Sequence, residues 1–301
     1  MPEFGLVVKA YGGFFYIATG TASGRPQEIV EAVLRGKLKK ENKKGALPPV
    51  LVGDKVDFLR QEGSAVIYRV HHRKTELVRP PIANVDQVVV VASASTPLPD
   101  LLLMDKIIAL AESQVIDVII ALNKVDVQDP DVVKRVQSHY RQSLYPIIET
   151  SAKTGTGLAE LSRNLVGRIS VLAGPSGVGK SSLLKRLVPG YDPKTQPVSA
   201  KSARGRHTTR HVELLPLPNG GYIADTPGFS SLNLSDIELE ELSFLFPEFQ
   251  ELIPECKFSG CLHIPEPGCA VKAGLQEGLV SPGRYENYCR MVEEIKAQEK
   301  W

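Results

Sequence analysis

The segment of this chain best suited to chemistry is a glycine-rich run of eight residues that matches the pattern G-x-x-x-x-G-K-[ST]. Its glycines let backbone N–H groups turn toward phosphate oxygens, and a following helix N-terminus adds a favourable dipole. The apolar run 169–173 predicts a strand before the motif, and residues 182–187 predict a helix after it. Lys180 would reach the β- and γ-phosphates, and the Ser181 hydroxyl would bind Mg²⁺. The predicted phosphate loop comprises Gly174, Pro175, Ser176, Gly177, Val178, Gly179, Lys180 and Ser181, with Ser182 beside it.

A second motif indicates which base accompanies those phosphates. Asn123-Lys124-Val125-Asp126 follows the apolar run 118–122, which predicts another strand. The Asp126 carboxylate can accept hydrogen bonds from the N1–H and the exocyclic amine of guanine, an edge that adenine lacks. Asn123 would brace the loop, and the Lys124 stem would cover the base. Ser151-Ala152-Lys153 follows a third predicted strand at 146–149, and its backbone would meet the guanine carbonyl.

Two segments have the residue types that respond to a γ-phosphate. Asp225-Thr226-Pro227-Gly228 follows the predicted strand 222–224. Asp225 would hold Mg²⁺ through water, and the Gly228 N–H would contact the γ-phosphate. Thr208 or Thr209 would complete the Mg²⁺ site from the irregular segment 189–210, and the residues leave open which of the two does so. Ordering of both segments by the γ-phosphate predicts a nucleotide switch.

The residue that orients the attacking water is not evident from these motifs. Many GTP-hydrolysing domains place a glutamine after the glycine equivalent to Gly228, but here the position is Phe229. His207 is the candidate, because a near-neutral pKa and two ring nitrogens suit it to contact a water. The alternative is that His207 contacts only RNA or solvent.

The cysteines indicate a metal site rather than a disulfide framework. Cys256, Cys261, His263 and Cys269 supply three thiolates and one imidazole within fourteen residues. This set fits tetrahedral Zn²⁺ in a closed structural site with no open position for catalysis. Cys289 lies on the apolar face of a predicted final helix and is left out of the site.

The order of the motifs is unusual, because the guanine-type motif precedes the phosphate loop. In GTP-binding domains the phosphate loop normally comes first, so the order predicts a circularly permuted domain. The γ-phosphate sensor at Gly228 then leads directly into the cysteine-rich region. We therefore expect the nucleotide state to set the angle of that region relative to the N-terminal part of the chain.

The motifs require three structural units to position them. Residues 1–75 show short apolar runs at 5–8, 14–18, 50–56 and 64–68 with glycine-rich turns, which predicts an OB-fold-like β-barrel. Residues 76–234 alternate strand and helix patterns, which predicts an α/β domain with a parallel sheet. Residues 235–301 predict a mainly helical zinc-binding domain. A capping-box match at 235–238 predicts a helix start, and Tyr285, Tyr288, Val292 and Ile295 form one apolar stripe.

Composition excludes some classes of protein. The 301 residues are 43% hydrophobic and 23% charged, with a net charge of +2, so the whole chain is not a polycation. No apolar run reaches membrane-spanning length, and the N-terminus has no secretory pattern, which predicts a cytoplasmic protein without a membrane partner. Basic clusters at 35–44 and 201–206 would carry any contact with nucleic acid, although such runs are more often solvated surface.

Taken together, these features resemble the RsgA (YjeQ) family of small-ribosomal-subunit biogenesis GTPases over nearly the whole chain. The resemblance rests on motif order, the barrel, Arg35-Gly36-Lys37-Leu38, Gly205-Arg206-His207-Thr208-Thr209 and the cysteine–histidine spacing. It implies GTP hydrolysis to GDP, stimulation by the maturing small subunit and contacts with 16S rRNA, with no DNA partner. The family commonly has a third threonine where this chain has Arg210, so Thr208 and Thr209 both remain candidates for Mg²⁺.

Two other functions compete with an assembly GTPase. The first is a nucleotide-gated RNA-binding module in which hydrolysis is incidental, and a turnover unchanged by the subunit would favour it. The second is a membrane-trafficking GTPase, which the absence of a lipidation signal disfavours. The sequence favours a monomer.

Overall fold

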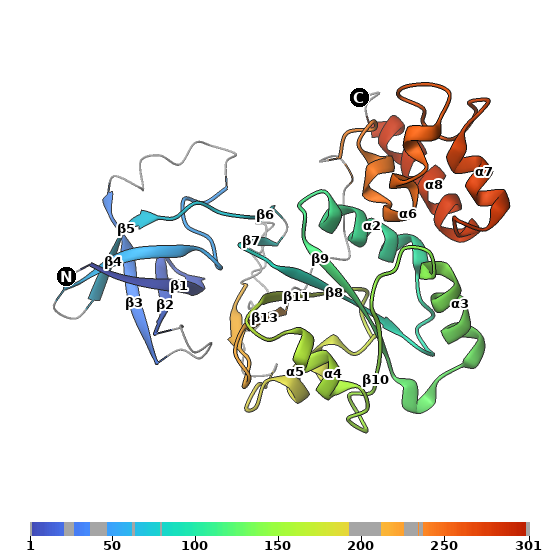
Figure 1. Ribbon diagram of the computed structural model, residues 1–301. Helices are drawn as coiled ribbons and strands as arrows, with labels where there is room; N and C mark the ends of the chain where they lie inside the picture. Colours follow the sequence, from blue (N-terminus) through green and yellow to red (C-terminus); the bar gives the residue numbers. More distant parts are fainter. Residues whose placement is uncertain are drawn as a thin grey trace, which may run out of the picture.

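The protein forms three units, as the computed structural model in Figure 1 shows. A barrel lies on one side, an α/β domain in the middle, and a helical module packs on the far end of the α/β domain. The structure describes residues 2–20, 27–36, 47–61, 64–78, 80–192, 212–225, 234 and 237–298, with the backbone alone at Asp225. No helix among these residues is both long and apolar enough to cross a membrane.

The N-terminal unit is a closed five-stranded barrel with strand order β1-β2-β3-β5-β4. All of its neighbouring strands are antiparallel except β3 and β5. Alternating side chains fill its interior, among them Val7, Ile17 and Phe58, which are fully buried. This confirms the predicted OB-type barrel. Its strands are β1 (Pro2–Tyr11), β2 (Phe14–Thr19), β3 (Glu28–Leu34), β4 (Lys55–Gln61) and β5 (Ser64–Val70).

Two details of the barrel differ from the sequence-based expectation. Strand β3 was not predicted, although its burial alternates along Glu28–Leu34. The strand predicted at 50–56 begins only at Lys55. The preceding residues leave the barrel wall because Gly53 comes so close to the Ala83 carbonyl oxygen that a Cβ would lie 2.0 Å from it. There the Ala83 N–H donates to the Val52 carbonyl oxygen at 2.8 Å.

The central unit contains a six-stranded sheet of order β10-β9-β8-β11-β13-β12. Every pair is parallel except β12 with β13, which form an antiparallel hairpin around Asn219-Gly220. The strand order reverses between β8 and β11, and such a switch point is where open α/β sheets bind ligands. The sheet strands are β8 (Gln87–Ser93), β9 (Asp117–Asn123), β10 (Ile147–Thr150), β11 (Ile169–Ala173), β12 (Leu214–Pro216) and β13 (Tyr222–Asp225).

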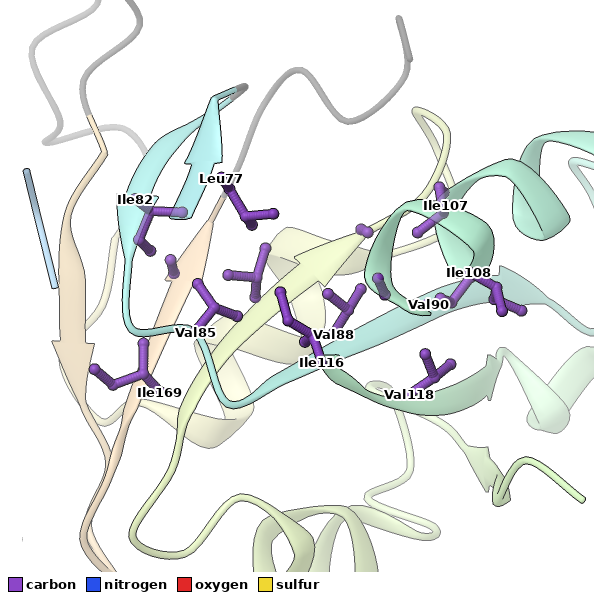
Figure 2. Packing of buried hydrophobic residues seen from close by; sticks show 14 of the residues in the cluster. Leu77, Ile82, Val85, Val88, Val90, Ile107, Ile108, Ile116, Val118 and Ile169 are labelled. Carbon is purple, nitrogen blue, oxygen red and sulfur yellow. The ribbon is translucent and has the colours of Figure 1, made fainter. Parts of the chain in front are cut away.

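Helices cover both faces of this sheet because its strands are apolar on both sides. Figure 2 shows Ile107 and Ile108 above Val88, Val90 and Val118 of the sheet. The opposite face carries a separate core that includes residues of α4 and α5. The helices are α2 (Leu101–Glu112), α3 (Pro130–Tyr140), α4 (Leu158–Asn164) and α5 (Lys180–Leu187), with the short 3-10 turn η2 at Val125–Val127.

The barrel docks on the α/β domain through a hairpin and an edge strand. The hairpin pairs β6 (Glu76–Val78) with β7 (Pro81–Ala83), and Val52 forms a parallel bridge to Ile82. The fully buried Asp54 carboxylate accepts two hydrogen bonds from Arg73, each 2.8 Å long. At the other contact the backbone of Lys9 in β1 forms an isolated antiparallel β-bridge with Glu213, next to β12. Their side chains form a 3.2 Å ion pair.

The C-terminal module is mainly helical, as predicted. Its core includes Leu242, Phe246, Phe249, Tyr288 and Met291, and it also takes in Ala109 from α2. The apolar stripe of the final helix is confirmed, but no helix follows the capping-box match: residues 237–241 are irregular or form turns, while 235 and 236 lie outside the described residues. The elements are η4 (Leu242–Leu245), α6 (Pro247–Gln250), η5 (Ile253–Glu255), α7 (Ala270–Glu277) and α8 (Pro282–Gln298).

Candidate functional site

The phosphate-loop motif occupies the turn between β11 and α5, at the switch point of the sheet. Two of its glycines are required by close contacts: a Cβ on Gly174 would lie 2.4 Å from the Val91 carbonyl oxygen, and one on Gly179 would lie 2.3 Å from Asn123 Nδ2. Both also have positive φ angles, of 137° and 103°. The Lys180 ammonium donates to the carbonyl oxygens of Gly174 and Pro175, both at 2.8 Å. The lysine therefore lies across the mouth of the loop.

Asn123 holds three loops together at the end of β9. Its side-chain N–H donates to the Val178 carbonyl oxygen at 2.9 Å, which ties it to the phosphate loop. Its Oδ1 accepts from the Ala152 N–H at 3.2 Å, which ties it to the loop after β10. Asn123 is 2% exposed, so water cannot reach its side-chain amide. These contacts satisfy the amide instead. The predicted bracing role of Asn123 agrees with this geometry.

Lys124 links the guanine-type loop to the phosphate loop from the outside. Its ammonium donates to the carbonyl oxygens of Gly177 and Thr96, both at 2.7 Å. Its backbone lies in the left-handed region at φ 68°. The same side of the phosphate loop meets Pro97, whose ring would lie 3.7 Å from a Cβ on Gly177. Thr96 and Pro97 could not be predicted as part of the site, because they lie in the loop after β8 and belong to no motif.

The carboxylate at Asp126 is held in place by the loop after β10. The Ser151 hydroxyl donates to Asp126 Oδ1 at 2.6 Å, and the Lys153 ammonium lies 3.7 Å from Oδ2. The hydrogen bond from Ser151 lowers the pKa of Asp126 below its ordinary value, so the group is ionised at neutral pH. An ionised carboxylate with a fixed orientation is the acceptor that a guanine edge requires.

Several predicted residues lie outside the described part of the chain. These are His207, Thr208, Thr209, Thr226, Pro227 and Gly228, together with most of the two basic clusters. Strand β13 ends at Asp225, beside β11 in the parallel register Leu172↔Asp225. The backbone of Asp225 therefore lies next to the strand that enters the phosphate loop. Ser181 and Ser182 occupy the first turn of α5 and are exposed.

The four predicted metal ligands come together in the C-terminal module. One ligand atom from each of Cys256, Cys261, His263 and Cys269 lies within 4.8 Å of the others. His263 Nδ1 is 3.4 Å from Cys269 Sγ and 3.6 Å from Cys256 Sγ. His263 itself is 1% exposed and has a φ of 59°. Cys289 does not belong to this group, as predicted.

The chemistry of this cluster fits a metal ion better than four neutral side chains. Burial raises the pKa of the Cys261 thiol to about 12 and lowers the pKa of His263, so both groups are neutral on their own. Bound Zn²⁺ would reverse this preference for the thiols, because a coordinating thiol is deprotonated outright. Three sulfurs and one imidazole at these separations are a tetrahedral donor set. The residues therefore fit a structural metal ion.

The fold and the nucleotide motifs together define a circularly permuted P-loop GTPase. The phosphate loop follows the fourth sheet strand in chain order, β11, yet that strand lies at the centre of the sheet, and the guanine-type loop comes earlier in the chain. The chain belongs to the RsgA GTPase family. The family's GTPase domain matches residues 70–235, and its N-terminal domain matches residues 4–67.

Similar proteins support this assignment over the full length. A relative from Carboxydothermus hydrogenoformans, named small ribosomal subunit biogenesis GTPase RsgA, is 46% identical over 98% of this chain and 99% of its own length. The crystal structure of YjeQ from Thermotoga maritima matches with a TM-score of 0.82 at 38% identity, covering 98% of this chain and 99% of that one. YloQ, described as a circularly permuted GTPase, matches with a TM-score of 0.81 at 36% identity, over 99% of this chain and 96% of YloQ.

Proposed function

We propose that this GTPase binds the maturing small ribosomal subunit and hydrolyses GTP to GDP and phosphate as a late assembly checkpoint. Hydrolysis is stimulated by the subunit and promotes release. The observation that supports the nucleotide part is the joining of three loops by Asn123, which ties the guanine-type loop to the phosphate loop and to the loop after β10. Support for the subunit comes from full-length relatives that are named for its biogenesis. Work on the subunit would place the protein in the cytoplasm, without DNA or a membrane as partner.

In this proposal each motif contacts one part of the nucleotide. Asp126 binds the guanine edge, Lys124 covers the base, and the backbone of Ser151, Ala152 and Lys153 meets the guanine carbonyl. The backbone of the phosphate loop and Lys180 bind the phosphates. Mg²⁺ is held by Ser181, by Asp225 through water, and by Thr208 or Thr209, while Gly228 contacts the γ-phosphate. Zn²⁺ in the Cys256/Cys261/His263/Cys269 site has a structural role.

The substitution Asp126→Asn tests the guanine assignment. An amide offers only one acceptor and presents a donor to a guanine donor, so we expect GTP affinity to fall on the order of a hundredfold or more. Xanthosine triphosphate has a carbonyl where guanine has its amine, so we expect the variant to prefer it. Competition of each nucleotide against a fluorescent GDP analogue measures both effects. Asp131→Asn, a nearby exposed carboxylate, should leave both affinities unchanged.

We propose that His207 orients the attacking water in place of the missing glutamine. On that basis His207→Ala lowers subunit-stimulated turnover by about a hundredfold, which is typical for loss of a proton-transfer or water-orienting group. GTP affinity stays unchanged, because the imidazole contacts the water rather than the nucleotide. Single-turnover hydrolysis with and without purified subunits measures this. His211→Ala, directly after the segment that holds His207, is the control, and equal turnover of the wild type and His207→Ala would contradict the role.

The rate of GTP hydrolysis with and without small subunits tests the function as a whole. Strong stimulation is the expected result. An unchanged rate together with subunit binding would favour the alternative, a nucleotide-gated RNA-binding module whose hydrolysis is incidental. Binding measured across a salt series tests the 16S rRNA contact, because phosphate contacts predict a steep loss of affinity with salt. A flat response would argue for a protein-only interface.

A further inference from the structure

Helix α2 has two apolar faces, one on the sheet and one on the C-terminal module. Met104, Ile107 and Ile108 belong to the core shared with the sheet. Leu102 and Leu110 of the same helix pack against the core of the C-terminal module. Figure 1 shows the helix between the two units. A rearrangement of α2 would therefore change the packing of both the sheet and the C-terminal module.

The one acidic residue in the middle of this helix, Asp105, is fully buried at the junction. Its Oδ1 accepts from Arg284 Nη1 and from the Tyr140 hydroxyl, each at 2.8 Å. Its Oδ2 accepts from Asn287 Nδ2 at 2.7 Å and contacts His139 Nε2 at 2.8 Å. Burial alone would raise the pKa of Asp105, but the Arg284 charge and His139 outweigh it and hold the pKa below its ordinary value. Asp105 therefore joins α2, α3 and α8 as a carboxylate.

Along α8, two residues that bond Asp105 alternate with two that bond the backbone at the metal ligand His263. Arg284 and Asn287 bond Asp105, whereas the Tyr285 hydroxyl donates to the His263 carbonyl oxygen at 2.7 Å. The Tyr288 hydroxyl donates to the Leu262 carbonyl oxygen at 2.9 Å. Two turns of one helix thus contact both the cysteine–histidine cluster and the GTPase domain.

On the other side, both helices that meet at Asp105 lead back to the nucleotide loops. Helix α2 follows the loop in which the Thr96 carbonyl oxygen accepts from Lys124, and Pro97 lies against the phosphate loop at Gly177. Helix α3 follows the guanine-type motif directly, and its last turn supplies His139 and Tyr140 to Asp105. A continuous set of contacts therefore runs from the nucleotide loops through Asp105 to the metal ligands.

We propose that Asp105 couples the guanine-nucleotide site to the metal site of the C-terminal module, so that occupancy of either site stabilises the other. The coupling rests on the guanine-nucleotide binding proposed above and does not involve the ribosomal subunit. It is separate from the route through Gly228, because every contact in it lies among described residues outside the switch segments. Coupling of this kind is reciprocal: nucleotide raises the affinity for the metal, and the metal raises the affinity for nucleotide, by the same factor.

The test uses the full-length protein loaded with Zn²⁺. The affinity for the metal is measured by equilibrium competition with a coloured chelator, with and without saturating Mg²⁺–GDP, and GDP affinity is measured before and after metal removal. In the wild type we expect GDP to raise the metal affinity about fivefold or more, and metal removal to weaken GDP binding by the same factor. Two ratios describe the coupling: the metal affinity with GDP over that without it, and the GDP affinity with metal over that without it. In Asp105→Asn, which cannot balance the Arg284 charge, we expect both ratios to fall to about one.

Matched variants separate coupling from simple loss of stability. Asp54→Asn removes another fully buried carboxylate that pairs with an arginine, but on the barrel side, and should keep the wild-type ratios. If Asp105→Asn does not fold, Asn287→Ala removes one of the two α8 contacts and should lower the ratios partly. A wild-type ratio of one, or full ratios in the folded Asp105 or Asn287 variant, would overturn the coupling alone. Failure of GDP to bind would overturn the guanine assignment as well.

Discussion

Removal of the metal is expected to unfold much of the C-terminal module while the GTPase sheet stays folded. A unit of this size has a small core, which supplies only about 3–5 kcal/mol on its own. Structural zinc contributes on the order of 10 kcal/mol or more in small zinc domains, so its loss outweighs the core. Without a cation, the buried side chains of Cys261, His263 and Cys269 would also be left with poor partners. Hydrogen exchange should become fast in α7 and α8 and stay slow in β8 and β11.

The metal content and the exchange pattern should change together. Cys261→Ala, which removes one ligand, should lower the metal content and reproduce the exchange pattern of the metal-free protein. Cys289→Ala is the matched control, because this thiol lies on α8 outside the ligand group and should leave both unchanged. Addition of Zn²⁺ to the metal-free wild type should restore protection. Equal protection of α8 in the loaded and the metal-free protein would rule out a structural role for the metal.

Replacement of Arg284 by methionine should destabilise the junction between module and GTPase domain by about 3–5 kcal/mol. The arginine side chain is 1% exposed, pairs with Asp105 and Glu248, and lies over the Phe246 ring at 4.4 Å. Methionine keeps the apolar contacts but leaves two buried carboxylates without a cation. Opening of α8, measured by native-state hydrogen exchange on the zinc-loaded protein, reports the loss without assuming two-state unfolding.

Two further variants identify the cause of that loss. Arg290→Met, on the same helix, removes an exposed ion pair with Glu286 and should cost less than about 1 kcal/mol. Combining Arg284→Met with Asp105→Asn and Glu248→Gln removes the stranded charges and should recover part of the stability. If the triple variant were no more stable than Arg284→Met, the lost packing of the arginine side chain, rather than the unpaired carboxylates, would explain the destabilisation.

Local spacing predicted the parts of the site that depend on neighbours in sequence. The phosphate loop, the guanine-type loop and the cysteine–histidine cluster each lie within a short stretch, and each is a compact group in the structure. The buried junction could not be predicted in this way, because Asp105 and Arg284 are 179 residues apart. The sequence signal was an aspartate beside Lys106 within the largely apolar helix α2. It marks a buried partner but does not identify it.

In the barrel too, strand positions that depend on distant contacts could not be predicted from the local sequence. Residues 28–34 include three β-branched residues, a composition that could have indicated strand β3, whereas the late start of β4 could not be predicted. That start depends on the approach of Gly53 to Ala83 in the next unit, a tertiary contact that overrides the β-propensity of the apolar residues before it. Motif order predicted the permutation, because relinking the strands leaves the sheet order and the loop positions intact.

The pairing of Lys9 with Glu213 has a consequence for solubility. Strand β12 is the outer strand of the central sheet, and an exposed outer strand is a template for pairing with other chains. In the full-length protein β1 lies alongside that edge, and barrel residues Leu6 and Val8 share a core with Val212 and Leu214. A fragment that starts at residue 76 would lose this cover and expose both the edge and its apolar side chains. The barrel thus protects the permuted domain from self-association, in addition to any contact it makes with RNA.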